Sequence, residues 1–409
     1  MSTAIAEPAG LGLLDLSPED VVSVLLERAV QLPASDLFLE THAGHIAVLV
    51  RHLGLIRPFA RLPLDLGQRC ISHIKAVSQM DVTDHRRPQE GRWCHELQDR
   101  PLNLHVNSMP TLYGEDCCLR LLGTDQQGLS LEHLGLIPQD LNDLRTMLDS
   151  PSGLILVTGP SGAGKTSTVY ACLRYLNNGE RRINTIEDPI EYGIDGVRQS
   201  QVNPRIGLDF ADLLRSVIQQ APDVIMIGEI RDAVTAATAV HAASSGHLVL
   251  ATVHAPVAAQ ALESMRAWGV PSYFLASSLL GVLAQRLVRA LCPKCRKPYP
   301  LNLAPNVFDD VLRWLKPGEG LVLYSAGGCA ACQGSGYAAR TGVFEVLRVD
   351  HSLRALIAEG KSLEAVRKHA IAHGMIQLRQ AALLKVAQGQ TTAEEVVRLI
   401  PAEDLGLDS

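Results

Sequence analysis

Residues 159–166 read Gly-Pro-Ser-Gly-Ala-Gly-Lys-Thr and directly follow the apolar run Gly-Leu-Ile-Leu-Val-Thr at 153–158. This spacing is typical of a phosphate-binding loop, in which glycines let backbone N–H groups converge on phosphate oxygens. The lysine supplies a cation for the β- and γ-phosphates, and the threonine offers its hydroxyl to Mg²⁺. The apolar run predicts a buried strand before the loop, and residues 168–176 predict a helix after it. An ordinary glycine-rich turn is the alternative, but this context favours a nucleoside triphosphate site. The residues predicted to contact the nucleotide are Gly159, Pro160, Ser161, Gly162, Ala163, Gly164, Lys165, Thr166 and Ser167.

The composition is that of a soluble protein with two or three domains. The chain has 409 residues and a formal net charge of −6, so no global electrostatic attraction to nucleic acid is expected. Its nine cysteines are odd in number and unevenly spaced, which favours a reducing compartment over a secreted disulfide framework. Residues 1–12 lack the pattern of an export signal. We therefore expect a cytoplasmic protein without a direct nucleic-acid partner.

One uncharged, largely apolar segment, residues 267–285, approaches the length of a membrane span. Pro271 and several serines interrupt it, and Arg286 and Arg289 continue its helical pattern. The sequence therefore predicts a buried helix here instead of a membrane span.

Changes in pattern along the chain predict an α/β protein of several parts. Short alternating runs in the first third indicate an α+β domain, and alternating strand and helix patterns after it indicate a parallel sheet. The expected parts are a helical segment at 1–33, an α+β domain at 34–123, a linker at 124–133, a nucleotide-binding core at 134–291, a four-cysteine subdomain at 292–336 and a helical region at 337–409.

Two acidic segments lie downstream of the phosphate-binding loop. The apolar run at 224–227 is followed by Gly228 and Glu229, which is where a Walker B acid meets Mg²⁺ at the carboxyl end of a strand. Residues 185–192 read TIEDPIEY and place three carboxylates within five residues. We expect one of these acids to orient the water that attacks the γ-phosphate, with solvated surface charge as the alternative.

A histidine follows a third apolar run. Residues 248–253 predict another buried strand, and His254 comes directly after it. In a parallel sheet, His254 then emerges at the same edge as the phosphate-binding loop and is placed to sense the γ-phosphate. A structural or exposed histidine is the alternative.

Two C-x-x-C pairs predict a metal site. Four thiolates at this spacing close a tetrahedral Zn²⁺ site without an open position, so the metal is expected to be structural. A redox dithiol is the alternative. The predicted ligands are Cys292, Cys295, Cys329 and Cys332. The other five cysteines are expected to be buried apolar residues, namely Cys70, Cys94, Cys117, Cys118 and Cys172.

Together these segments resemble the type II secretion and type IV pilus assembly ATPases, most closely the type II secretion branch. The resemblance covers nearly the whole chain. Its motifs are GPSGAGKTSTVY at 159–170, TIEDPIEY at 185–192, DVIMIGEIRD at 223–232, GHLVLATVH at 246–254 and LLGVLAQRLVRALCPKC at 279–295. In the first domain, ASDLFLE at 34–40, RRPQEGRW at 86–93 and PTLYGEDCCLRLL at 110–122 are similar to the family's PAS-like domain.

The resemblance implies a RecA-like core and assigns roles to individual residues. Glu191 becomes the general base, Glu229 the Walker B acid beside Mg²⁺ and Thr166, and His254 a neighbour of the γ-phosphate. Arg92 and Arg120 become charge-stabilising arginines that reach the triphosphate from the preceding domain.

The resemblance also implies ATP and Mg²⁺ as ligands and a homo-hexameric ring on inner-membrane secretion or pilus platform proteins. Membrane association is then peripheral, through these partners. The implied function is pseudopilus assembly in type II protein secretion. Type IV pilus extension or DNA-uptake pilus assembly is one alternative, and a non-hydrolysing, nucleotide-gated scaffold is the other.

Three departures from the family pattern motivate the scaffold alternative. His105 stands where the family usually has an arginine before Val106. Gln219 and Ala221 stand where the family usually has the arginine and the first aspartate of an Arg-x-Asp-Pro-Asp run ahead of the Walker B strand. None of these departures changes Lys165 or the predicted catalytic carboxylates, so activity is expected.

Overall fold

The computed structural model describes residues 13–97, 100–122, 130–300 and 308–400. Contacts divide the chain into two compact units, residues 1–128 and 129–409. Most of the linker predicted at 124–133 lies outside the described residues.

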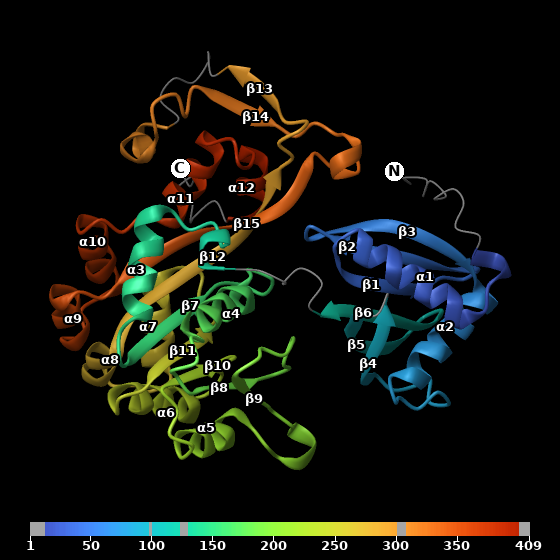
Figure 1. The fold of residues 1–409 in the computed structure, drawn as a ribbon, viewed down its shortest axis with the longest axis horizontal. Helices are drawn as coiled ribbons and strands as arrows, with labels where there is room; N and C mark the ends of the chain where they lie inside the picture. The colour runs from blue at the N-terminus through green and yellow to red at the C-terminus, as the bar shows by residue number, and fades with distance from the viewer. Residues whose placement is uncertain (1–12, 98–99, 123–129, 301–307, 401–409) are drawn as a thin grey trace. The chain divides into compact units, whose positions relative to one another are not determined.

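The first unit is a six-stranded antiparallel sheet with the strand order β3-β2-β1-β6-β5-β4. Helices α1 and α2 pack on one face, and their apolar side chains join those of the strands in one core (Figure 1). The strands are β1 (Ala34–Thr41), β2 (His45–His52), β3 (Leu55–Pro63), β4 (Gln89–Leu97), β5 (Arg100–Thr111) and β6 (Gly114–Leu122). The helices are α1 (Pro18–Gln31) and α2 (Leu64–Val77), after a short turn η1 (Leu13–Asp15).

Helix α1 begins where the sequence predicts. The Ser17 hydroxyl accepts the backbone N–H of Asp20 at 3.2 Å, and Pro18 occupies the first turn, as expected for a helix N-terminus. Val21 and Leu25 are fully buried in the core of the first unit. The predicted N-terminal helical segment is therefore packed into the α+β domain.

The second unit is built on a seven-stranded sheet with the order β15-β12-β7-β11-β10-β8-β9. All neighbouring pairs are parallel except β12 with β15. The strands are β7 (Gly153–Thr158), β8 (Ile183–Glu187), β9 (Val197–Gln201), β10 (Val224–Ile227), β11 (Leu248–Val253), β12 (Leu279–Leu291) and β15 (Tyr337–Arg348). The predicted α/β class with a parallel sheet is confirmed.

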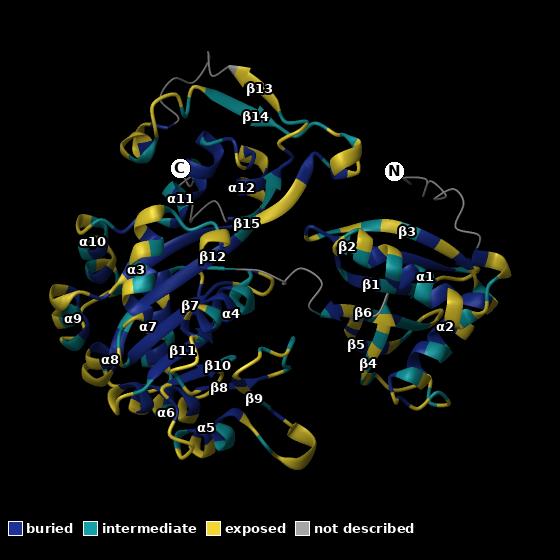
Figure 2. Cartoon of the chain, in the orientation of Figure 1, coloured by how far each residue is buried: buried dark blue, intermediate teal, exposed yellow. Residues whose placement is uncertain are grey.

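Helices cover both faces of this sheet, so its central strands are buried on both sides, as Figure 2 shows. One face packs with α3 and α4, and the other with α5 to α10. The helices are α3 (Pro138–Leu148), α4 (Lys165–Leu176), α5 (Phe210–Ile218), α6 (Ala233–Ser244), α7 (Ala258–Ala267), α8 (Ser272–Ser278), α9 (His351–Ala358) and α10 (Leu363–Ala372). Burial on two faces explains the continuous apolar runs of the sequence.

The remaining elements surround the far end of the β12–β15 pair. Apolar side chains of α11 and α12 pack there against Val288 and Val343 in a separate cluster. These elements are β13 (Lys297–Pro300), η4 (Asp309–Trp314), β14 (Val322–Ser325), η5 (Ala330–Cys332), α11 (Leu378–Ala387) and α12 (Ala393–Leu399). Short turns η2 (Leu131–His133) and η3 (Pro204–Ile206) complete the unit.

Two predictions of local structure are wrong. The buried helix expected from residue 267 through Arg289 is helix α8 followed by strand β12. The region at 337–409, expected to be helical, begins with the twelve-residue strand β15, which extends the sheet of the nucleotide-binding core. Both strands are long apolar runs, and such runs do not distinguish a buried strand from a buried helix.

Among the described residues, no helix is long and apolar enough to cross a membrane.

Candidate active site

The phosphate-binding loop connects β7 to α4. Gly159, Gly162 and Gly164 have φ angles of +149°, +76° and +86°, which residues with a Cβ rarely adopt. Helix α4 begins at Lys165, so unpaired N–H groups and the positive end of the helix dipole lie at the loop. The loop therefore has the properties of an anion site.

Main-chain carbonyl groups of the loop hold the ammonium group of Lys165. Its Nζ donates to Gly159 O at 2.7 Å and to Pro160 O at 3.2 Å. Burial lowers the pKa of Lys165, and the charge of Glu229 opposes this effect. A triphosphate would give this cation charged oxygen partners, which form stronger hydrogen bonds than neutral carbonyls.

Four parallel strands bring the predicted residues to one edge of the sheet. Strands β7 and β11 pair up to their last residues, Thr158 and Val253, and β10 and β8 pair beside them. The residues that follow these strands at the shared edge are Gly159, Asp188, Gly228, Glu229 and His254. The loop, Glu229 and His254 therefore lie at one edge of the sheet, as the sequence predicts.

A connected set of polar side chains extends from the loop along this edge. Lys165 Nζ lies 3.5 Å from His254 Nδ1, and His254 Nε2 lies 2.6 Å from Glu229 Oε1. These contacts are satisfied by a neutral imidazole that donates from Nε2 to the carboxylate and accepts at Nδ1 from the lysine. His254 therefore links the loop cation to the predicted Walker B carboxylate.

Sequence reasoning missed the next member of the set, Arg231. Its guanidinium donates to Glu229 Oε2 at 2.6 Å and to Asp188 Oδ2 at 3.2 Å. The hydrogen bond to Glu229 is the main cause of its raised pKa. An arginine two residues after a strand-end carboxylate was the available signal, because alternate residues of an extended segment point to the same side.

The first carboxylate of the 185–192 segment is structural. Glu187 is 2 % exposed and accepts hydrogen bonds from Tyr170 OH, from Thr185 Oγ1 at 2.6 Å and from Gln199 Nε2 at 3.0 Å. Burial and the neighbouring carboxylate raise the pKa of Tyr170 above its usual range. Because three donors already satisfy it, Glu187 holds this segment in place.

Glu191 follows in the loop beyond β8 and is half-buried. Its backbone N–H donates to Tyr170 OH at 3.4 Å. The buried Glu187–Tyr170 pair therefore fixes the backbone of the segment that carries Glu191.

The predicted arginines belong to the first unit and lie in one row across its sheet. Arg92 pairs with His105, His105 with Arg120, Arg120 with Asp36, and Asp36 with Arg51. The residues adjacent to this row along the strands are buried against α1 and α2, so the row occupies the other face of the sheet.

A buried carboxylate orients two of these arginines. Asp36 accepts Arg120 Nε at 3.1 Å and Arg51 Nε at 3.3 Å. The side chain of Arg120 is 65 % exposed, and Arg92 is also exposed. His105, the departure from the family pattern, stands between Arg92 and Arg120 in this row.

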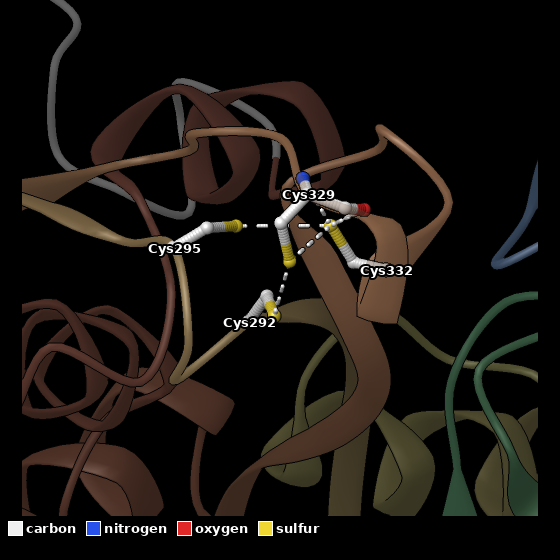
Figure 3. Close-up of side chains that lie close together, drawn as sticks. All are labelled: Cys292, Cys295, Cys329 and Cys332. Atoms are coloured by element: carbon white, nitrogen blue, oxygen red, sulfur yellow. Dashed lines mark hydrogen bonds between the residues drawn. The ribbon is translucent and has the colours of Figure 1, made fainter.

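The four predicted zinc ligands converge, as Figure 3 shows. Their Sγ atoms all lie within 4.8 Å of one another. The Cys292–Cys329, Cys295–Cys332 and Cys329–Cys332 Sγ distances are 3.9, 3.7 and 3.7 Å. Tetrahedral zinc with Zn–S bonds of about 2.3 Å requires Sγ atoms about 3.8 Å apart, so the cluster fits this metal.

Backbone donors favour the thiolate form of one ligand, Cys332, whereas burial raises the pKa of Cys295 to about 12. Burial acts to raise the pKa of Cys332, but the N–H groups of Cys329 and Gly336, which donate to its Sγ at 3.3 and 3.2 Å, contribute to a net lowering. Zinc binds thiolates, so this arrangement supports metal binding.

The other five cysteines are free. Cys70, Cys117 and Cys172 are buried as predicted, and Cys118 is half-buried. Cys94 is exposed on the outer face of β4, so its prediction as a buried residue is wrong.

A phosphate-binding loop at the centre of a parallel sheet, with an acid and a histidine at the same edge, defines a RecA-like P-loop ATPase. More specifically, the chain belongs to the type II/IV secretion system protein family, whose model matches residues 15–398.

Curated relatives match almost the entire chain. Type II secretion system protein E of Dickeya dadantii is 41% identical over 383 residues, which cover 94% of this chain and 76% of the relative. Type II secretion system ATPase E of Vibrio cholerae is 40% identical over 380 residues, which cover 93% and 74%.

Solved structures agree with the fold. The ATPase DotB of Legionella pneumophila aligns with a TM-score of 0.69 at 18% identity over 93% of this chain and 95% of its own. The pilus retraction motor PilT with bound ADP aligns with a TM-score of 0.63 at 24% identity over 94% and 97%. At identities this low, these similarities show a shared fold only.

Proposed function

We propose that this chain is a Mg²⁺-dependent ATPase that powers pseudopilus assembly in type II protein secretion. The observation that carries the proposal is the set of contacts from Lys165 through His254 to Glu229, at the edge where the phosphate-binding loop lies. These contacts bring together a cation for phosphate, an imidazole and a carboxylate suited to a metal ion. The secretion assignment is supported by relatives of that name that are about 40% identical over more than nine-tenths of the chain.

Within this proposal the loop residues bind the triphosphate, and Thr166 and Glu229 hold Mg²⁺. The metal supplies positive charge that offsets the charge of the phosphate oxygens. Glu191 acts as general base toward the attacking water. Its fixed backbone and half-buried position support this role, because a base must be held at a defined place relative to its proton donor.

Arg92 and Arg120 are proposed to stabilise the charge that builds up during γ-phosphate transfer. Support comes from their exposure on one row of a rigid sheet and from the contact of Asp36 with Arg120. A guanidinium carries five N–H donors in a planar fork, a geometry that matches phosphate oxygens.

The assembly is proposed to be a homo-hexameric ring bound to inner-membrane secretion platform proteins, at the cytoplasmic face of the membrane. Structural zinc at the four cysteines joins the two ends of the 292–336 insertion. Four protein thiolates leave no open coordination position, so the metal has no catalytic part.

Secretion assays in a bacterium that lacks its own copy of the gene test this assignment. The wild-type gene should restore export of type II substrates, and the Glu191→Gln gene should not. Glu180→Gln, which changes an exposed carboxylate after α4, is the matched control and should restore export. Restoration of pilus extension without protein export would instead assign the motor to pili.

A further inference from the structure

Strand β12 contacts the phosphate-binding loop, and its Gln285 does so with both main chain and side chain. Ala284 pairs with Thr158, the last residue before the loop, so Gln285 lies beside the start of the loop. A Cβ on Gly159 would lie only 2.5 Å from Gln285 O. The loop therefore packs directly on the main chain of β12 at this point.

The side chain of Gln285 contacts the other end of the loop. Its Nε2 donates to Ala163 O at 2.8 Å, and the residue is 1 % exposed. A Cβ on Gly164 would lie 3.3 Å from the same Nε2. One buried residue thus contacts both the first and the last part of the loop.

This hydrogen bond fixes the direction of a backbone donor. The Ala163–Gly164 peptide is trans, so the carbonyl of Ala163 and the N–H of Gly164 point in opposite directions. While Gln285 holds the carbonyl on the β12 side, the Gly164 N–H is directed away from β12. Rotation of this peptide would turn the donor back toward β12, and the positive φ of Gly164 makes such a rotation sterically accessible.

The other polar atom of the Gln285 side chain, Oε1, makes no such contact with the loop. Gln285 Oε1 is buried and has no hydrogen-bond partner among the described residues. A buried acceptor without a partner is unfavourable for folding. The amide therefore contributes its N–H donor to the loop at some expense of stability.

We propose that Gln285 is a positioning residue for nucleotide binding, which holds the Ala163–Gly164 peptide so that the Gly164 N–H is directed at the triphosphate. The inference rests on the proposed nucleotide site and adds a residue outside the phosphate-binding motif. Arg286, the next residue of β12, donates from Nη1 to Gln285 O at 3.1 Å and steadies the same stretch of main chain.

Gln285→Met tests the role because methionine has nearly the same volume and no N–H donor. We expect its KM for ATP and its Kd for a fluorescent ATP analogue to rise about tenfold, the effect of weakening one charge-assisted hydrogen bond. Its melting temperature should change little, because the loss of the bond to Ala163 is offset by removal of the unpaired Oε1. Ser278→Ala is the matched control: it removes a buried hydrogen bond near the start of β12, to Phe274 O, and should lower the melting temperature without changing KM.

Gln285→Glu gives a second readout, the dependence of ATP affinity on pH. The introduced carboxyl group donates to Ala163 O only when protonated, so ATP affinity relative to wild type should improve as the pH falls. Division by the wild-type profile removes the contributions of Lys165, His254 and Glu229. Wild-type ATP affinity in Gln285→Met would overturn the inference. So would a ratio of the Gln285→Glu Kd to the wild-type Kd that does not change with pH. A wild-type protein that binds no nucleotide would overturn the proposed function as well.

Discussion

The acids of the 185–192 segment differ in their surroundings and therefore in their tasks. Glu187 is buried with three donors, whereas Glu191 is half-buried beyond the strand end. Asp188 lies between them and pairs with Arg231. In the proposed mechanism Glu191 is the acid that exchanges a proton with the attacking water.

Substitution of Glu191 should lower activity, whereas substitution of Glu187 should lower stability. Glu191→Gln should lower kcat by about 10²–10⁴-fold, the usual contribution of a general base, while the melting temperature and ATP binding stay near wild type. Glu187→Gln should lower the free energy of unfolding by roughly 2 kcal/mol, because an amide cannot accept all three buried hydrogen bonds. Steady-state kinetics and thermal melts of both variants check this. A Glu191→Gln enzyme with wild-type kcat would exclude Glu191 as the base.

The buried side chain of Asp140 should make the stability of the protein depend on pH. Burial raises the pKa of Asp140 on α3 to about 7, with a smaller effect from Asp143, and Asp140 Oδ2 has no partner among the described residues. The folded state then binds a proton that the unfolded chain releases near pH 4, so Asp140 lowers stability progressively as the pH rises from about 4 to about 7.

Asp140→Asn should therefore raise the free energy of unfolding at pH 8 by roughly 1–4 kcal/mol and change it little at pH 4. Asp143→Asn is the control, because Asp143 is paired with Arg348 at 2.9 Å and should lose stability instead. Denaturant unfolding at both pH values measures the difference. An equal effect of Asp140→Asn at pH 4 and pH 8 would contradict the raised pKa.

Motif spacing predicted which residues reach the edge of the sheet, because apolar runs of a parallel sheet end at a common edge. It did not predict Arg231 or Gln285. The partners of Arg231, Glu229 and Asp188, follow two different strands, β10 and β8. Gln285 meets the loop across 122 residues of sequence, and no local pattern encodes such a contact.

Strand β12 links the nucleotide site to the four-cysteine cluster. It begins beside β7, contacts the phosphate-binding loop at Gln285 and ends at Leu291, directly before Cys292. The cysteine spacing predicted the four-cysteine cluster. The sequence did not predict this strand, because an apolar run buried on both faces shows no alternation. The cluster thus closes an insertion between two paired strands, β12 and β15.

Metal removal should loosen this insertion and leave the loop intact. We expect one zinc per chain in the wild type and none in Cys329→Ser, with faster proteolysis within 292–336 and a lower melting temperature. Nucleotide affinity should change less than twofold, a difference of about 0.4 kcal/mol. Cys94→Ser, which changes an exposed thiol outside the cluster, should retain its zinc. Full zinc content in Cys329→Ser would contradict the assignment of this ligand.

The two units of the chain each carry one part of the proposed machinery. The second unit holds the phosphate-binding loop and the acids, and the first presents the row that includes Arg92 and Arg120. If a ring is the active form, turnover per chain should rise with protein concentration in step with the hexamer fraction. Sedimentation velocity beside ATPase assays measures both, and constant turnover per chain across dissociation of the ring would contradict this.

Arg120 and Arg51 form a matched pair for testing the arginine role, because both contact Asp36. Arg120→Ala should lower kcat by about 100-fold or more, as for loss of an arginine that stabilises transferring phosphate. Arg51→Ala should retain most activity. Equal losses in the two variants would indicate that the arginines act only through the packing of Asp36.

Motor activity is tested by Mg²⁺-dependent ATP hydrolysis by the purified protein at ring-forming concentrations, beside Lys165→Ala and Glu191→Gln. We expect turnover in the wild type, loss of both binding and turnover in Lys165→Ala, and binding without turnover in Glu191→Gln. Tight ATP binding by the wild type without turnover, even with the membrane partner added, would contradict a motor and indicate a nucleotide-gated scaffold.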